Sequence, residues 1–85
     1  MMASRGLVRI KAIREMLGAC AEGFDWKEKP HHHWVAYRGK TYRALPKGGH
    51  GRGEEGEIQI GHLKKMIRFL GIEEDCAKRY LPILG

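Results

Sequence analysis

This sequence of 85 residues has little of what larger or exported proteins use. Its longest apolar runs are far too short to cross a bilayer, and nothing at its N-terminus resembles a secretory signal. We therefore expect a cytoplasmic protein with no membrane partner. At this length the chain is predicted to be a single domain, 1–85, with no room for a cofactor-binding fold beside a substrate domain.

Cysteine is scarce, because Cys20 and Cys76 are the only two. Each falls within a helical pattern and is expected to be a small core residue, since a free cysteine packs like a small apolar side chain. A disulfide between them is the less favoured alternative, because a reducing cytosol keeps thiols free. Two distant cysteines without a C-x-x-C spacing do not make a zinc site.

Positive charge is what the sequence has in excess. Sixteen Lys and Arg residues against ten Asp and Glu residues give a formal net charge of +6. Charge of this sign attracts phosphate polyanions and accelerates encounters with them. Composition therefore favours a nucleic-acid partner, with a basic surface that binds nothing as the simpler alternative.

Hydrophobic periodicity predicts two amphipathic helices. Apolar residues recur at three- and four-residue steps over about 8–22, where Gly23 is placed to end a helix. A second stripe over 63–70 ends at Gly71, and the acidic residues 73–75 suit the start of a further short helix. The stripe residues that we expect to pack together are Ile13, Leu17, Leu63, Met66, Ile67 and Leu70.

The region between the two helices favours strands. Residues 24–29 alternate weakly, and residues 31–37 are rich in aromatic and branched side chains. A tight turn at 38–40 leads into a returning strand that ends at Pro46. Residues 47–57 contain five glycines and are expected to form a surface loop, without the G-x-x-x-x-G-K-[ST] motif of a phosphate loop. No internal repeat is evident, and the order of elements predicts an α+β fold.

Two segments resemble the HicA family. Residues 58–72, IQIGHLKKMIRFLGI, are similar to its C-terminal signature, apolar-x-x-G-T-L-[KR]-x-I-[LI]-R-x-A-G-[IL]. Residues 29–33, KPHHH, resemble the family's K-G-S-H-H segment, with proline and histidine in place of the small pair. The positions that match the C-terminal signature are Gly61, Leu63, Lys64, Ile67, Arg68, Gly71 and Ile72.

The resemblance covers about residues 8–72 and implies a fold and an activity. The implied fold is like the double-stranded RNA-binding domain, α-β-β-β-α with an antiparallel three-stranded sheet. The extension 73–85 would add a short C-terminal helix, and residues 1–6 are expected to be disordered. The implied activity is that of the toxin in a type II toxin–antitoxin system, a metal-independent endoribonuclease that cleaves mRNA and is restrained by a HicB-like antitoxin. The family's functional histidine aligns with His32.

His32 suits RNA cleavage because RNA carries its own nucleophile, the 2′-hydroxyl. The reaction needs a base for that proton, an acid for the leaving 5′-oxygen and positive charge near the phosphate, but no cofactor. Histidine serves as base or acid near neutral pH, and lysine and arginine bind phosphate. The candidate RNA-binding residues are Lys29, Lys40 and Arg43 on the hairpin and Lys64, Lys65 and Arg68 on the second helix.

Two alternative functions stay open beside the nuclease. One is a non-catalytic RNA-binding module of the same fold, and the other is a protein-interaction domain. Strand alternation sends His31 and His33 to the face opposite His32, where His50 from the loop could join them around zinc or nickel. No ligand spacing supports a functional metal site, so such binding would be adventitious.

Three aromatic residues, Trp34, Tyr37 and Tyr42, are candidates for stacking on bases. The chain has few other large apolar side chains, since aromatic residues make up only 8% of it. We therefore expect each of the three to belong to the core rather than to a binding surface.

Overall fold

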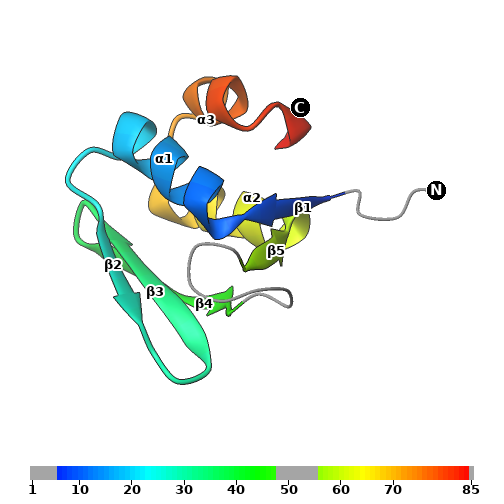
Figure 1. Ribbon diagram of the computed structural model, residues 1–85. Coiled ribbons are helices and arrows are strands. Elements are labelled where there is room, and N and C mark those ends of the chain that lie inside the picture. The colour runs from blue at the N-terminus through cyan, green and yellow to red at the C-terminus, as the bar shows by residue number, and fades with distance from the viewer. Residues whose placement is uncertain (1–5, 48–55, 85) are drawn as a thin grey trace.

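The computed structural model describes residues 6–47 and 56–84 as an α+β fold (Figure 1). Of residues 1–6, predicted to be disordered, residues 1–5 lie outside the described residues, whereas Gly6 is described in a turn. Most of the predicted loop 47–57 also lies outside the described residues. None of the helices within the described residues is long and apolar enough to cross a membrane. The elements are β1 (Leu7–Arg9), α1 (Ile10–Cys20), β2 (Asp25–Glu28), β3 (His32–Tyr37), β4 (Lys40–Pro46), β5 (Glu57–Gln59), α2 (Ile60–Leu70), α3 (Glu74–Tyr80) and the 3₁₀ helix η2 (Pro82–Leu84).

The strands form two antiparallel sheets, one with the order β2-β3-β4 and one of β1 with β5. The three-stranded sheet confirms the prediction. The β1–β5 pair was not predicted, and it places Val8 and Glu57 in strands rather than in a helix and a loop. Strands of three residues are too short to show the alternation of apolar and polar residues that is typical of a strand. Their apolar residues are therefore read as part of the apolar pattern of the helix that follows.

The segments β1–α1 and β5–α2 are alike. Val8 pairs with Ile58 at the centre of the ribbon, and its two ends are closed by matching hydrogen bonds. The Ile10 N–H donates to the Gly56 carbonyl, and the Ile60 N–H donates to the Gly6 carbonyl. The chain therefore contains a repeated strand–helix unit. This repeat was not predicted, because it preserves mainly apolar positions. Those positions, paired between the units, are Ile13 with Leu63, Met16 with Met66 and Leu17 with Ile67.

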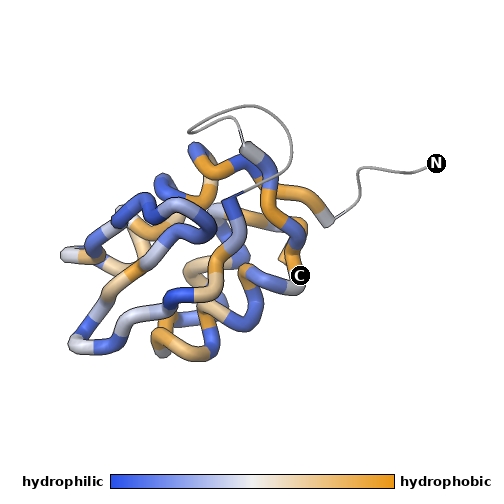
Figure 2. Tube along the Cα trace, turned by 90° about the horizontal axis from the view of Figure 1, so that it is seen from below, coloured by the Kyte–Doolittle hydropathy of each residue, from blue (hydrophilic) through white to orange (hydrophobic). Residues whose placement is uncertain are grey.

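The molecule has three layers (Figure 1). Helices α1 and α2 lie between the sheet β2-β3-β4 on one side and α3 with η2 on the other. The stripe of α2 is buried in one core with residues of α1 and the sheet, as predicted. Among the described residues, the helices lie on one side of the sheet β2-β3-β4 (Figure 1), which leaves its other face uncovered by helices. The view from below shows hydrophilic residues along much of the trace (Figure 2).

The hairpin between β3 and β4 turns at Arg38 and Gly39, as predicted. Tyr37 pairs with Lys40, so the turn has two residues, and both have positive φ values of 53° and 81°. A two-residue turn of this kind matches the twist of the strands that it joins, and glycine adopts such a backbone without strain. The predicted end of α2 at Gly71 is confirmed by its left-handed backbone.

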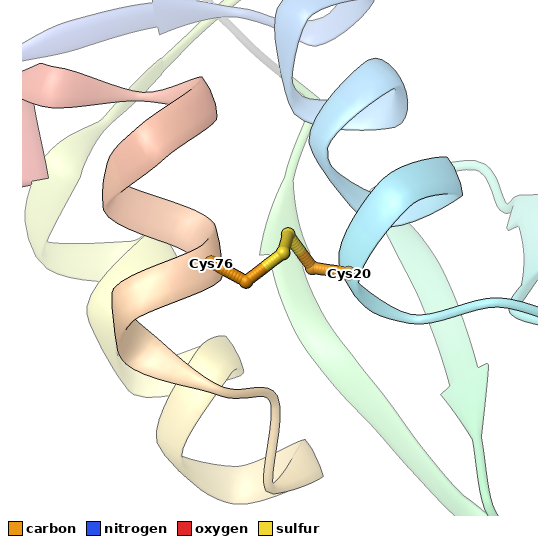
Figure 3. The surroundings of a disulfide bond; sticks show 2 residues. All are labelled: Cys20 and Cys76. Atoms are coloured by element: carbon orange, nitrogen blue, oxygen red, sulfur yellow. A yellow bond between two sulfur atoms is a disulfide. The ribbon is translucent and has the colours of Figure 1, made fainter.

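A disulfide joins Cys20 at the end of α1 to Cys76 in α3, with 5.8 Å between their Cα atoms (Figure 3). The prediction of two free core cysteines was therefore wrong. The two cysteines meet because α3 folds back onto α1, a long-range contact that no local pattern signals. Disulfides persist mainly in oxidising compartments, so the cytoplasmic location stays a prediction.

Candidate nucleic-acid interface

His32 is exposed at the first position of β3. The preceding loop closes the β2–β3 hairpin, and the Lys29 N–H donates to the His32 carbonyl at 2.8 Å. Pro30 has no N–H to donate, which suits a loop position. The local sequence therefore places His32 at the start of the central strand, next to the loop that carries Lys29.

Alternation along β3 separates the three histidines. His33 and Val35 face the helices and are buried, with exposed fractions of 3% and 0%. His32, Trp34 and Ala36 occupy the alternate positions and point to the opposite face. The prediction that His32 and His33 lie on opposite faces is confirmed, whereas His31 lies in the loop before the strand. We call the uncovered side the open face; its residues are Asp25, Lys27, Lys29, His32, Trp34, Ala36, Thr41 and Arg43.

Trp34 lies at the centre of the open face between two cations. The Lys29 Nζ atom is 4.6 Å from the centroid of its ring, and the Arg43 Cζ atom is 4.8 Å from it. Trp34 is half-buried and is not part of the core, so its predicted core role was wrong, whereas Tyr37 and Tyr42 do pack against the core. An aromatic residue on a strand has the same sequence pattern on either face, so periodicity could not decide this.

An irregularity in the β3–β4 ladder brings Arg43 to the tryptophan. His33 pairs with Leu45 and Val35 pairs with Tyr42, so two residues of β4 oppose Trp34 alone. Such a bulge re-aims a side chain, and Arg43 is exposed here beside the ring. The predicted RNA-binding residues Lys29 and Arg43 thus lie on the same face as His32.

The other predicted RNA-binding residues lie elsewhere. Lys40 pairs with Tyr37 at the far end of β3, about 16 Å along the strand from His32. Lys64 and Arg68 line a cavity of about 170 Å³ between α2 and α3, and Lys65 is exposed on α2 outside it. We call this cavity the α2–α3 groove; it is lined by Lys64, Ile67, Arg68, Glu74, Ala77, Lys78 and Leu84.

Beneath the open face, His33 is enclosed by charged and aromatic groups. The centroid of the Trp26 ring is 4.9 Å from that of His33, and neither imidazole nitrogen has a well-formed hydrogen bond among the described residues. Across the strands, Lys47 donates to the Glu28 carboxylate at 2.8 Å, which lowers the pKa of Glu28. Burial and then the charge of Lys47 lower the pKa of His33, opposed by the Glu28 carboxylate and the backbone at Lys47.

Within residues 6–47 and 56–84, no group of three or more His, Cys, Asp or Glu side chains is placed to hold a metal ion. His33 is buried under the sheet while His31 is exposed in the loop, and His50 lies outside the described residues. The structure therefore separates His31 from His33, two of the three histidines of the metal hypothesis.

Comparisons with protein families, with curated proteins and with solved structures found no match to this chain. The site is therefore described from its own geometry, which is an exposed histidine and a tryptophan flanked by two cations on one face of an antiparallel sheet. This combination is typical of a surface that binds RNA.

Proposed function

We propose that this protein is a HicA-like toxin, a metal-independent endoribonuclease with a double-stranded RNA-binding-like fold that cleaves mRNA on its open face. One observation carries the proposal. The exposed His32 shares this face with Trp34, and the cations of Lys29 and Arg43 lie against the same ring. A strand of RNA on this face would meet a base or acid, positive charge and an aromatic surface together.

The chemistry needs one proton carrier. His32 in its neutral form removes the proton from a 2′-hydroxyl, and the resulting oxygen attacks the adjacent phosphorus. The bond from phosphorus to the 5′-oxygen breaks, and His32 returns the proton to that leaving oxygen. The products are a 2′,3′-cyclic phosphate and a free 5′-hydroxyl. Lys29 and Arg43 stabilise the negative charge that develops on the phosphate oxygens.

Incubation of the protein with a labelled mRNA in the presence of a chelator tests the proposal. Wild type should cleave the RNA, and His32→Ala should reduce the rate by at least about 100-fold, because general acid–base groups contribute factors of this size. His31→Ala is the matched control, since His31 is also exposed but lies in the preceding loop.

Each other outcome points to a different function. Cleavage by His32→Ala at the wild-type rate would show that the histidine is misassigned. Activity that the chelator removes and zinc restores would favour a metal enzyme. RNA binding without any cleavage would favour the non-catalytic module of the same fold.

A HicB-like antitoxin is the proposed protein partner, with an acidic surface that covers His32 and competes with RNA.

The α2–α3 groove favours protein binding as the second candidate function. Its floor is apolar, formed by Ile67, Ala77 and Leu84, and its rim carries three cations. An acidic segment with an apolar side chain would match both the apolar floor and the basic rim. An antitoxin that binds the open face would compete with RNA, whereas one that binds the α2–α3 groove would not.

A further inference from the structure

The open face contains a hollow that the cleavage chemistry does not use. Along β3 the large indole of Trp34 is followed, on the same face, by the methyl group of Ala36. Asp25 on β2 and Thr41 on β4 both pair with Ala36 and flank it on either side. The small residue between larger neighbours leaves a cavity of about 230 Å³, lined also by Lys27 and Arg43.

The lining of this hollow has the chemistry of a nucleobase site. Trp34 provides an aromatic surface, on which a base would take the place of the Lys29 or Arg43 cation that now lies over the ring. Unpaired bases stack on such surfaces in single-stranded RNA complexes. Asp25 provides a hydrogen-bond acceptor, and a carboxylate accepts from the exocyclic amino group of cytosine. Uracil presents a carbonyl oxygen at the same position, so two acceptors would face each other. Lys27 and Arg43 provide charge for the neighbouring phosphates.

The hollow also lies in a suitable place relative to His32. Trp34 is two residues from His32 on the same strand face, a distance of about 7 Å along the strand. A base stacked on Trp34 therefore belongs to a nucleotide close to the phosphate that His32 would act on. A base inside a duplex is paired and stacked, so only a single-stranded segment can place one in the hollow.

We propose that this cavity is a base-specificity pocket, which stacks a base of single-stranded RNA on Trp34 and selects cytosine over uracil through Asp25. The inference rests on the proposed function, since it takes RNA as the ligand of the open face. It requires no cleavage, however, so binding alone can test it.

The test uses the His32→Ala protein, so that binding is measured without cleavage. The probes are fluorescently labelled hexacytidylate and hexauridylate, two single strands of equal charge and length. Hexacytidylate should bind about fivefold more tightly, the effect of one hydrogen bond. Adding Trp34→Ala should weaken binding of both strands about tenfold, whereas Trp34→Phe should retain most of the affinity, because stacking tolerates any aromatic ring.

Asp25→Asn separates base selection from charge. An amide can both donate and accept, so this variant should bind the two strands equally. Asp75→Asn is its matched control, because it removes the same charge from α3 and should keep the fivefold preference. Circular dichroism confirms the fold of each variant, and Asp25→Asn and Trp34→Phe carry the test if Trp34→Ala does not fold.

The outcomes distinguish the pocket from the proposed function. Equal binding of the two strands, or binding that Trp34→Ala leaves unchanged, would overturn the pocket and leave an RNA-binding protein. Tighter binding of an RNA duplex than of either single strand would overturn it as well. Failure to bind any of these RNAs would overturn both the pocket and the proposed function.

Discussion

The open face and the α2–α3 groove have similar charges but differ in the uncharged side chains beside those charges. Each contains three cations and one carboxylate. The open face surrounds a tryptophan and ends at His32, whereas the groove has a floor of aliphatic side chains. The charged residues are Asp25, Lys27, Lys29 and Arg43 on the open face and Lys64, Arg68, Glu74 and Lys78 around the groove.

This difference shows what net charge can and cannot indicate. A charge of +6 predicts attraction to polyanions but not the surface that binds them. The aromatic ring and the histidine favour the proposed RNA on the open face, because bases stack on aromatic rings and a histidine can transfer the proton that RNA cleavage requires. An aliphatic floor offers no stacking surface for a base and suits an apolar side chain of a protein instead.

The largest expected difference between the two regions is in the free energy of unfolding that is lost when Ile67 or Trp34 is replaced by alanine. Ile67 belongs both to the core and to the floor of the groove, so Ile67→Ala should lower the free energy of unfolding by about 2–5 kcal/mol. Trp34→Ala should cost only about 1 kcal/mol, since it loses cation–π contacts on an exposed face. Urea denaturation measures both, and equal losses would show that Trp34 is a core residue.

The disulfide should matter for the groove more than for the open face. It closes a sequence separation of 56 residues, so Cys20→Ser with Cys76→Ser should lower the free energy of unfolding by about 2–4 kcal/mol. Because α3 forms one wall of the groove, its amide resonances should shift while those of β3 stay in place. Wild type treated with reductant is the control, and changes spread equally over both regions would contradict this separation.

Salt dependence compares the two sets of cations directly. Each phosphate contact releases counterions, so the logarithm of RNA affinity falls linearly with the logarithm of salt concentration. Lys29→Ala with Arg43→Ala should flatten this slope by roughly one to two units. Lys64→Ala with Arg68→Ala removes the same charge and should flatten it less. If the α2 variant has the larger effect, the main RNA-binding surface is the helix and not the sheet.

The smallest expected effect is a pH dependence that comes from His33, on the face of β3 that is buried beneath the open face. Burial lowers the pKa of His33 below its ordinary value of 6.5, so the unfolded chain binds a proton more readily than the folded one. Stability should therefore be full above about pH 6.5 and should fall as the pH drops towards the folded pKa. His33→Leu should remove this component and His31→Leu should keep it, as thermal denaturation across pH would show. A fall that persists in His33→Leu would assign it to another group.

Much of the fold follows from local sequence. The stripe of α2, its end at Gly71 and the tight turn at Arg38 and Gly39 were all predictable, since each depends on neighbouring residues. The β1–β5 ribbon was not, because its strands of three residues gain their identity only from pairing across the chain. The disulfide was missed for the same reason, since α3 meets α1 only in the folded molecule.

Sequence alone determined that the protein is basic, that its helices are amphipathic and that His32 and His33 point to opposite faces of a strand. These properties follow from composition and from the periods of helices and strands. Only the tertiary structure decided which of these faces the helices cover, and therefore that Trp34 is accessible while His33 is buried. It also divided six candidate basic residues among different surfaces, because the packing of distant elements, and not their order along the chain, determines which side chains meet.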